Sequence, residues 1–172
     1  TATLLLSGQV LVVAGSQGAP VLNSAELYDP VAKTWATVGS LAKVRYSHTA
    51  SVLSGGKVLV VGGAVGASEL ANAELYNPVT KTWSPADSLA TGRRAHTASV
   101  LADGSVLVTG GYAGAGVVLA SAELYDPATD AWSLAGNLAK ARERFAEAWS
   151  AFDELHASAW QQRATASLAM ID

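Results

Sequence analysis

One segment occurs three times in this 172-residue sequence, at a spacing of 48 or 49 residues. Each copy contains an apolar run that ends in glycine, then Ala-Glu-Leu-Tyr followed by Asp or Asn and Pro, and finally a tryptophan. The apolar runs are Thr1 to Gly15, Thr49 to Gly63 and Thr97 to Gly111. A fixed period of this length is typical of units that cannot bury their own apolar faces and must stack on neighbours. The sequence therefore predicts three similar units, each packed against the next.

Each unit is predicted to form four antiparallel strands. In the second unit, Thr49 to Leu53 and Val58 to Val61 are apolar runs separated by a glycine-containing turn, which is typical of a hairpin. Ala73 to Tyr76 forms the third strand, and Pro78 ends it because proline cannot join a central ladder. Thr82 to Ser84 forms a short edge strand. The second strands lack polar alternation, so we expect them to be buried on both faces.

The repeat resembles the kelch motif of β-propellers over residues 1 to about 142. The resemblance rests on a double glycine, a tyrosine, a spaced tryptophan and an arginine before the next unit: Gly62-Gly63 and Gly110-Gly111; Tyr28, Tyr76 and Tyr125; Trp35, Trp83 and Trp132; Arg45, Arg93 and Arg142. The first copy departs at Ala14-Gly15. The Ala-Glu-Leu-Tyr-Asp-Pro segment looks like the bacterial, galactose-oxidase-like branch of this family. The resemblance implies a secreted or cell-surface protein.

The expected fold class is mostly β, with three four-stranded propeller blades over residues 1–41, 48–89 and 96–138 of a domain 1–139. The tryptophan of each blade is predicted to be interior, packed between blades. Propellers have about 4–8 blades, so three leave apolar faces open. Pairing of two chains, membership in a longer propeller, or a capping element would each cover those faces. The start at Thr1, inside a repeat and without methionine, is interpreted as a processed product or a fragment.

Residues 140–172 are predicted to form a C-terminal amphipathic α-helix. The repeat stops after Arg142, and apolar residues then recur at three- and four-residue steps. The predicted docking stripe of this helix consists of Phe145, Trp149, Phe152, Leu155 and Trp160. We interpret the stripe as a cap on the open blade face or as a dimer contact. A docking helix for a different protein and a fusion junction are the alternatives.

A ligand is expected at the end of the blades where the long loops and the blade-to-blade links lie. The loops cover residues 16–24, 64–72 and 112–121, whereas the opposite end has tight turns that leave little binding surface. Arginines pair carboxylate or sulfate groups bidentately. The predicted ligand-binding residues are Lys43, Arg45, Tyr46, Arg93, Arg94, Tyr112 and Arg142.

Two kinds of arginine stand among these residues. Arg45, Arg93 and Arg142 recur once per blade, so the favoured interpretation of these three is that they donate hydrogen bonds to neighbouring backbone. Lys43, Tyr46 and Arg94 break the repeat and are the more informative candidates. The recurring His48 and His96 are interpreted as structural. The recurring glutamates are expected to pair with the arginine or histidine of the adjacent blade, because buried carboxylates need partners: Glu26, Glu74 and Glu123.

Composition excludes several functions. The formal net charge is −3, so nucleic-acid binding is not expected. There is no cysteine, hence no disulfide and no thiolate metal site, and no apolar run reaches the roughly 20 residues of a membrane span. The chemistry of galactose oxidase, one kelch relative, needs a cysteine-crosslinked tyrosine at copper, which this sequence does not supply. No cofactor or metal is expected.

The favoured function is a non-catalytic binding or scaffold module that recognises a protein partner or an acidic or glycan ligand. One alternative is a structural module that forms homo-oligomers through the C-terminal helix and the open blade faces. A propeller enzyme is the less favoured alternative, because no P-loop, nucleophile elbow or metalloprotease motif is present.

Overall fold

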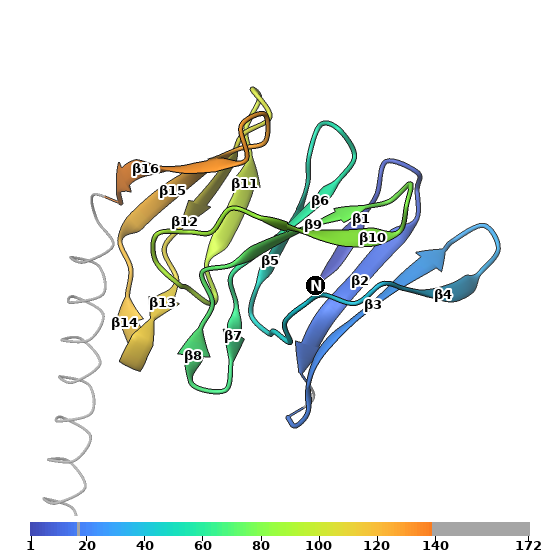
Figure 1. Cartoon of the computed structure of the whole chain (residues 1–172), viewed down its shortest axis with the longest axis horizontal. Coiled ribbons are helices and arrows are strands. Elements are labelled where there is room, and N and C mark those ends of the chain that lie inside the picture. The colour runs from blue at the N-terminus through green and yellow to red at the C-terminus, as the bar shows by residue number, and fades with distance from the viewer. Residues whose placement is uncertain (17, 139–172) are drawn as a thin grey trace, which may run out of the picture. The chain divides into compact units, whose positions relative to one another are not determined.

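The computed structural model describes residues 1–16 and 18–138 (Figure 1). The predicted C-terminal helix lies outside the described residues, together with its stripe of Phe145, Trp149, Phe152, Leu155 and Trp160. Arg142 lies outside them as well. Residues 1 to 137 form one compact unit.

Three four-stranded antiparallel sheets follow one another along the chain (Figure 1). Blade 1 contains β1 (Ala2–Leu4), β2 (Val10–Ser16), β3 (Val21–Asp29) and β4 (Thr34–Val38). Blade 2 contains β5 (Thr49–Val52), β6 (Val58–Val61), β9 (Ala73–Asn77) and β10 (Thr82–Ala86). Blade 3 contains β11 (Thr97–Val100), β12 (Val106–Thr109), β15 (Ser121–Asp126) and β16 (Ala131–Asn137). The prediction of three four-stranded sheets is confirmed.

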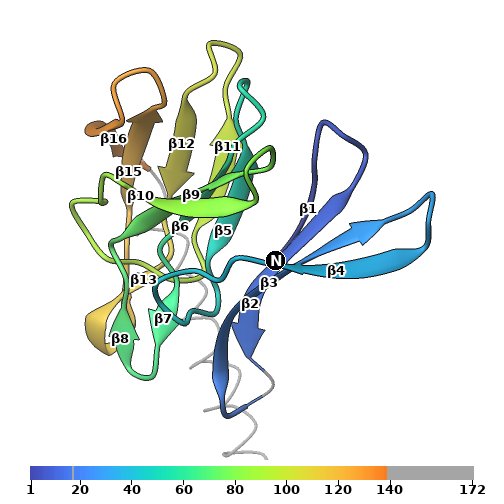
Figure 2. The same cartoon turned by 45° about the vertical axis from the view of Figure 1, so that its right-hand side comes forward.

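Two short hairpins that the sequence did not predict extend the loops between the second and third strands of blades 2 and 3. The first pairs β7 (Ala64–Val65) with β8 (Ser68–Glu69), and the second pairs β13 (Tyr112–Ala113) with β14 (Val117–Val118). A 3-10 turn, η1 (Gly114–Gly116), connects β13 to β14. Both hairpins project from the same end of their blades (Figure 2).

The hydrophobic core consists of two clusters, one at each junction between neighbouring blades. In the first cluster, apolar residues of blade 1 meet β6 and β9 of blade 2: Leu5, Leu11, Val13, Ala25, Leu27, Val38 and Leu41 pack with Val58, Val60 and Tyr76. The second cluster repeats this arrangement one blade later: Leu53, Leu59, Val61, Ala73 and Leu89 pack with Val106, Val108 and Tyr125. Each blade therefore has a forward face that packs on the next blade and a back face that packs on the previous one.

The central strand β6 shows the effect of having a neighbour on both sides. All four of its residues, Val58–Val61, are buried, as the missing polar alternation predicted. The corresponding residues Val10 and Val12 in β2 are only half-buried. They belong to the back face of blade 1, against which the described residues place no other blade.

The first strands of the three blades lie next to one another, since β5 contacts both β1 and β11. Two hydrogen bonds between a threonine and a histidine connect neighbouring blades here. Thr1 Oγ1 lies 3.0 Å from His48 Nε2, and Thr49 Oγ1 lies 2.8 Å from His96 Nε2. Both histidines are buried. Desolvation, with help from nearby positive charge, lowers the pKa of His48 to about 3 and that of His96 to about 4. The two histidines are thus neutral links between blades, in line with a structural role.

The prediction that all three repeated tryptophans are interior is wrong: Trp35 is 57% exposed, and Trp83 and Trp132 are only half-buried at the edge of the core. In each blade the tryptophan packs at a tilt against the repeated tyrosine, with ring centroids 5.0–5.1 Å apart. The indoles of Trp83 and Trp132 also donate a hydrogen bond to a carbonyl of the preceding blade, that of Gly39 and of Asp87 respectively. Trp35 lies in blade 1 and has no preceding blade among the described residues, so its ring stays in solvent.

Ala14 departs from the repeat, because the equivalent residue in blade 2 is the glycine Gly62, and this difference gives two stability predictions. Gly62 has φ +60°, and a Cβ atom there would lie 2.6 Å from the carbonyl oxygen of Arg93 in the link to blade 3. We expect Gly62→Ala to lower the free energy of unfolding by about 1–2 kcal/mol. Ala14 occupies the same place in blade 1 with φ +51°. Ala14→Gly should raise the free energy of unfolding by about 0.5–1 kcal/mol, because glycine adopts positive φ without strain. Urea denaturation measures both, and a destabilising Ala14→Gly would contradict this account.

Candidate functional site

Arg45 and Arg93 hold neighbouring blades together. The Arg45 side chain is fully buried; its Nη2 bonds Glu74 Oε1 at 2.6 Å, and its Nη1 donates to the carbonyl of Gly62 at 2.8 Å. Arg93 repeats the pattern, with Nη2 on Glu123 Oε1 at 2.7 Å. Each guanidinium comes from the link after one blade and reaches into the next. Glu74 and Glu123 therefore pair with the recurring arginines, whereas Glu26 is exposed and has no ion pair among residues 1–16 and 18–138.

The same carboxylates also bind the backbone of the link. The amide of Ala42 donates to Glu74 Oε2 at 2.8 Å, and the amide of Ala90 donates to Glu123 Oε2 at 2.7 Å. Burial lowers the pKa of Arg45, while the charge of Glu74 and its hydrogen bond oppose that shift. A buried charge of this kind needs its partner to remain in place.

This geometry corrects the prediction that Arg45 and Arg93 contact a ligand. Both side chains are fully buried, and their Nη donors are occupied by the next blade. Of the two interpretations that the sequence left open, donation to neighbouring backbone is the one observed for these two arginines, and that backbone belongs to the next blade.

Arg94, which breaks the repeat, lies in a different environment from its neighbour Arg93. Its side chain is 38% exposed, its guanidinium lies 5.9 Å from the ring centroid of Tyr112, and its Nε bonds Glu69 Oε1 at 3.2 Å. The backbone of Arg94 also bridges to Tyr112. The structure thus brings together two predicted site residues, Arg94 and Tyr112, and adds Glu69.

Tyr46 occupies the equivalent place one blade earlier. Its backbone bridges to Ala64 in β7, and its hydroxyl donates to the carbonyl of Gly66 at 2.9 Å. Hairpin β7–β8 therefore has Tyr46 on one side, and on the other side its Glu69 contacts Arg94. Tyr112 pairs with Val118 across hairpin β13–β14, and both Val117 and Val118 are exposed. We refer to these residues as the loop-end surface: Tyr46, Glu69, Arg94, Tyr112, Val117 and Val118.

The sequence missed Glu69 because nothing in its surroundings repeats and the two-residue strand β8 has no pattern. Lys43, another predicted site residue, is exposed and lies elsewhere. It lines a hollow of about 440 Å³ whose other lining residues include Trp83 and Pro85, none of them in the loop-end surface.

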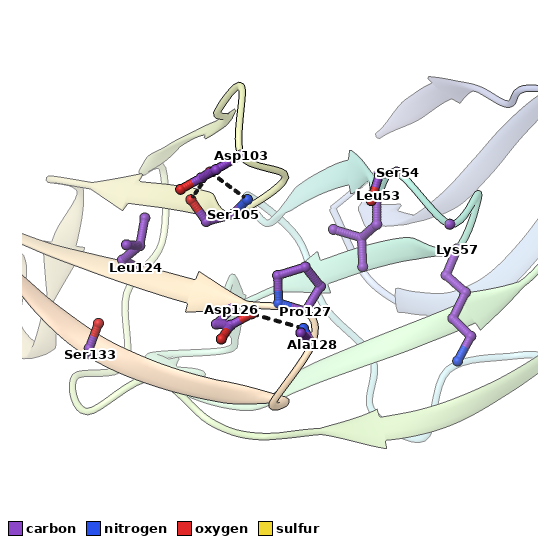
Figure 3. Close-up of a pocket in the computed structure, with 11 residues that line it drawn as sticks. Leu53, Ser54, Lys57, Asp103, Ser105, Leu124, Asp126, Pro127, Ala128 and Ser133 are labelled. Atoms are coloured by element: carbon purple, nitrogen blue, oxygen red, sulfur yellow. Dashed lines mark hydrogen bonds between the residues drawn. The ribbon is translucent and has the colours of Figure 1, made fainter.

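A hollow of about 750 Å³ lies at the tight-turn end of blades 2 and 3 (Figure 3). It contradicts the expectation that this end leaves little room for a ligand. Among its lining residues are Leu53, Lys57, Asp103 and Asp126. The two aspartates are engaged by their own turns, since Asp103 accepts from Ser105 and Asp126 accepts from the amide of Ala128. These hydrogen bonds lower the pKa of both carboxyl groups, which are therefore turn-forming residues.

In the part of the chain that the structure describes, no group of three or more His, Asp or Glu side chains is arranged to hold a metal ion. Helices long and apolar enough to cross a membrane are likewise not found there.

Three antiparallel four-stranded blades, joined by buried links at each junction, define a segment of β-propeller type. The kelch motif matches residues 2–42, 45–90 and 93–139. The chain belongs to the kelch-repeat family, as its double glycines, tyrosines and tryptophans indicated.

One solved structure similar to this chain is described as a novel fungal alcohol oxidase with catalytic diversity among the AA5 family, in complex with copper. The two share 19% sequence identity with a TM-score of 0.60, and the similarity covers 77% of this chain and 29% of that one. At this identity the likeness concerns the fold alone, and the chain spans less than a third of that structure's length. No curated protein matches the chain.

Proposed function

We propose that this chain is a non-catalytic binding module, and that its loop-end surface recognises an acidic segment of a protein partner. The observation that carries the proposal is the position of Arg94. Its guanidinium is anchored through Nε to Glu69 and lies by the Tyr112 ring, so the side chain is oriented while more than a third of it is in solvent. Guanidinium nitrogens held in this way form paired hydrogen bonds with a carboxylate.

The surroundings of Arg94 favour a peptide. Tyr112 and the exposed Val117 and Val118 offer apolar contact area beside the charge. Tyrosine and arginine are enriched at protein interfaces, where an aromatic ring gives area at low entropic cost. Both strands of hairpin β13–β14 supply these residues, on a blade whose inner strands are fixed by the core.

The repeat also separates binding from structure. Arg93 recurs in the links between blades, and its side chain pairs with Glu123 of the next blade. Arg94 does not recur, since the equivalent position in the link after blade 1 is Tyr46. A residue that the fold does not require at every blade is available for recognition. The hollow at the opposite end has its aspartates bound within their own turns, which favours the loop-end surface over it.

Binding of a fluorescein-labelled, glutamate-rich octapeptide to the full chain tests this proposal by fluorescence anisotropy. Arg94→Met should raise the Kd of this peptide at least roughly tenfold, because one charge-assisted pair contributes about 1.5–3 kcal/mol. Lys33→Met is the matched control, since it removes one positive charge from an exposed turn between β3 and β4. We expect its Kd to stay within about twofold of the parent at physiological salt.

Equal weakening by the two variants would mean that only net charge matters and would contradict the proposed site. Failure of the parent chain to bind the octapeptide would contradict an acidic peptide as ligand. A sulfated oligosaccharide that binds the parent in its place, and loses affinity in Arg94→Met, would replace the protein partner by a glycan.

A further inference from the structure

Lys43 is a predicted site residue that the loop-end surface does not include. It lies in the link between blades 1 and 2, where its side chain is exposed and lines the hollow of about 440 Å³. No ion pair of Lys43 is found within residues 1–16 and 18–138. Pockets for small molecules have volumes of about 300–1,000 Å³, with mostly apolar walls and a few polar groups. The Lys43 hollow is therefore large enough for a small molecule.

The Lys43 hollow has two walls. Trp83 and Pro85 of the edge strand β10 form one wall, because alternate residues of a strand lie on the same face of the sheet. The link forms the other wall with Ser40, Ala42 and Lys43. Every lining residue lies between positions 40 and 88, within blades and links that the structure describes.

The indole of Trp83 is held in place by the protein itself. Its ring packs at a tilt against Tyr76, with centroids 5.1 Å apart, and its Nε1 donates to the carbonyl of Gly39 at 2.5 Å. The side chain is half-buried, so part of the ring stays open beside the link. A ligand that stacks on this ring does not have to order it first, which lowers the entropic cost of binding.

The charge of the Lys43 hollow is positive. Two charged side chains line it, Lys43 and Glu74. The side chain of Glu74 is 6% exposed, and its two carboxylate oxygens accept from the guanidinium of Arg45 and from the amide of Ala42. The charge of Glu74 is thus balanced within the protein, whereas the ammonium group of Lys43 is free to pair with an anion.

The lysine and the proline are exceptions to the repeat. At the next junction, Thr91 stands in place of Lys43, and Leu134 stands in place of Pro85 opposite the recurring glutamate. That junction has the same arginine–glutamate pair and the same indole hydrogen bond. The fold therefore requires neither a lysine nor a proline at these positions, which leaves both available for recognition.

We infer that the Lys43 hollow binds a small aromatic carboxylate, with its ring on Trp83 and Pro85 and its carboxylate at the ammonium group of Lys43. An aromatic ring fits this wall because aromatic pairs gain free energy beyond the area that they bury. A carboxylate fits the opposite wall because the ammonium group there has no counterion among the described residues. The inference does not rest on the proposed function, since the loop-end surface shares no residue with this hollow.

Isothermal titration calorimetry of the full chain with 2-naphthoate tests this inference. Lys43→Met should raise the Kd of 2-naphthoate roughly fivefold, because it removes a partly solvated ion pair. Pro85→Ala should raise it roughly threefold, because it removes apolar area without changing a charge. Lys33→Met, in the exposed turn between β3 and β4, is the matched control and should stay within about twofold of the parent. Circular dichroism checks that each variant keeps the spectrum of the parent.

Failure of the parent chain to bind 2-naphthoate would overturn the inference, as would equal weakening by Lys43→Met and Lys33→Met. The neutral analogue 2-naphthamide should bind roughly fivefold more weakly than 2-naphthoate. If the two compounds bind equally well, the carboxylate is not recognised and the inference is wrong. Arg94→Met should leave the Kd of 2-naphthoate unchanged, whereas a loss of binding in this variant would place the ligand at the loop-end surface and overturn the inference. The proposed binding of an acidic peptide can therefore fail separately.

Discussion

Replacing Glu74 by glutamine is expected to lower the free energy of unfolding by about 3–5 kcal/mol, because it leaves the buried charge of Arg45 without its counterion. The substitution keeps the size and shape of the side chain, so the loss reports the charge and not a cavity. Glu74 accepts hydrogen bonds from both Arg45 and Ala42, one on each carboxylate oxygen. Glutamine has only one such oxygen, so its NH2 group would face one of these two donors. Urea denaturation of the two proteins measures the difference.

Glu69→Gln is the matched control for this experiment. Glu69 is also paired with an arginine, but Arg94 is 38% exposed and the contact is longer, at 3.2 Å. The Glu69 side chain is 9% exposed, so this pair is partly buried, but solvent screens it from the Arg94 side. We therefore expect Glu69→Gln to cost clearly less than Glu74→Gln, nearer the about 0–1 kcal/mol that exposed ion pairs contribute. If the two substitutions cost the same, the interblade pair is not the joint described above.

Lowering the pH from 7 to 5.5 is expected to cost about 2.5 kcal/mol of the free energy of unfolding, through His48 and His96. Their pKa values of about 3 and 4 lie below the value of about 6.5 in the unfolded chain. The unfolded state therefore binds protons first, and the stability present above pH 6.5 is lost as the pH falls. Each histidine contributes about 1.4 kcal/mol at pH 5.5, where the folded state has not yet taken up its proton.

Urea denaturation at several pH values checks this dependence. A variant with glutamine at both histidine positions is less stable but should show a nearly flat dependence between pH 7 and 5.5, since glutamine does not titrate. A parent chain whose stability does not change over this range would show that the histidines are accessible to protons in the folded state.

The blades could be predicted because three copies of one segment give the same strand pattern, even where a single copy alone would leave the strand assignment ambiguous. The strands around the double glycines and the paired roles of arginine and glutamate follow from positions that recur in every copy. The ion-pair partner of the recurring glutamates was also predictable. A buried carboxylate such as Glu123 needs a cation, and only the arginine or the histidine recurs in the adjacent blade to supply one.

What the repeat could not predict is how each copy differs from the others. Lys and Thr precede both Trp35 and Trp83, yet Trp35 is exposed because no preceding blade among residues 1–16 and 18–138 accepts a hydrogen bond from its indole. Hairpins β7–β8 and β13–β14 are too short to carry a strand pattern, so Glu69 was not recognised beside Arg94. The prediction that Arg45 and Arg93 bind a ligand failed because both residues recur in every blade and pair with the next blade, so their donors are not available to a ligand.

The most direct test of the different roles of Arg93 in the fold and Arg94 in binding compares two double-mutant cycles, one on each of these neighbouring residues. The first uses Arg93→Met and Glu123→Gln, and the second uses Arg94→Met and Glu69→Gln, with unfolding followed in urea. We predict a coupling free energy above about 2 kcal/mol for the buried pair and below about 1 kcal/mol for the partly exposed pair. Equal couplings, or a larger one at Arg94, would contradict the assignment of Arg93 to the interblade joint and of Arg94 to the binding surface.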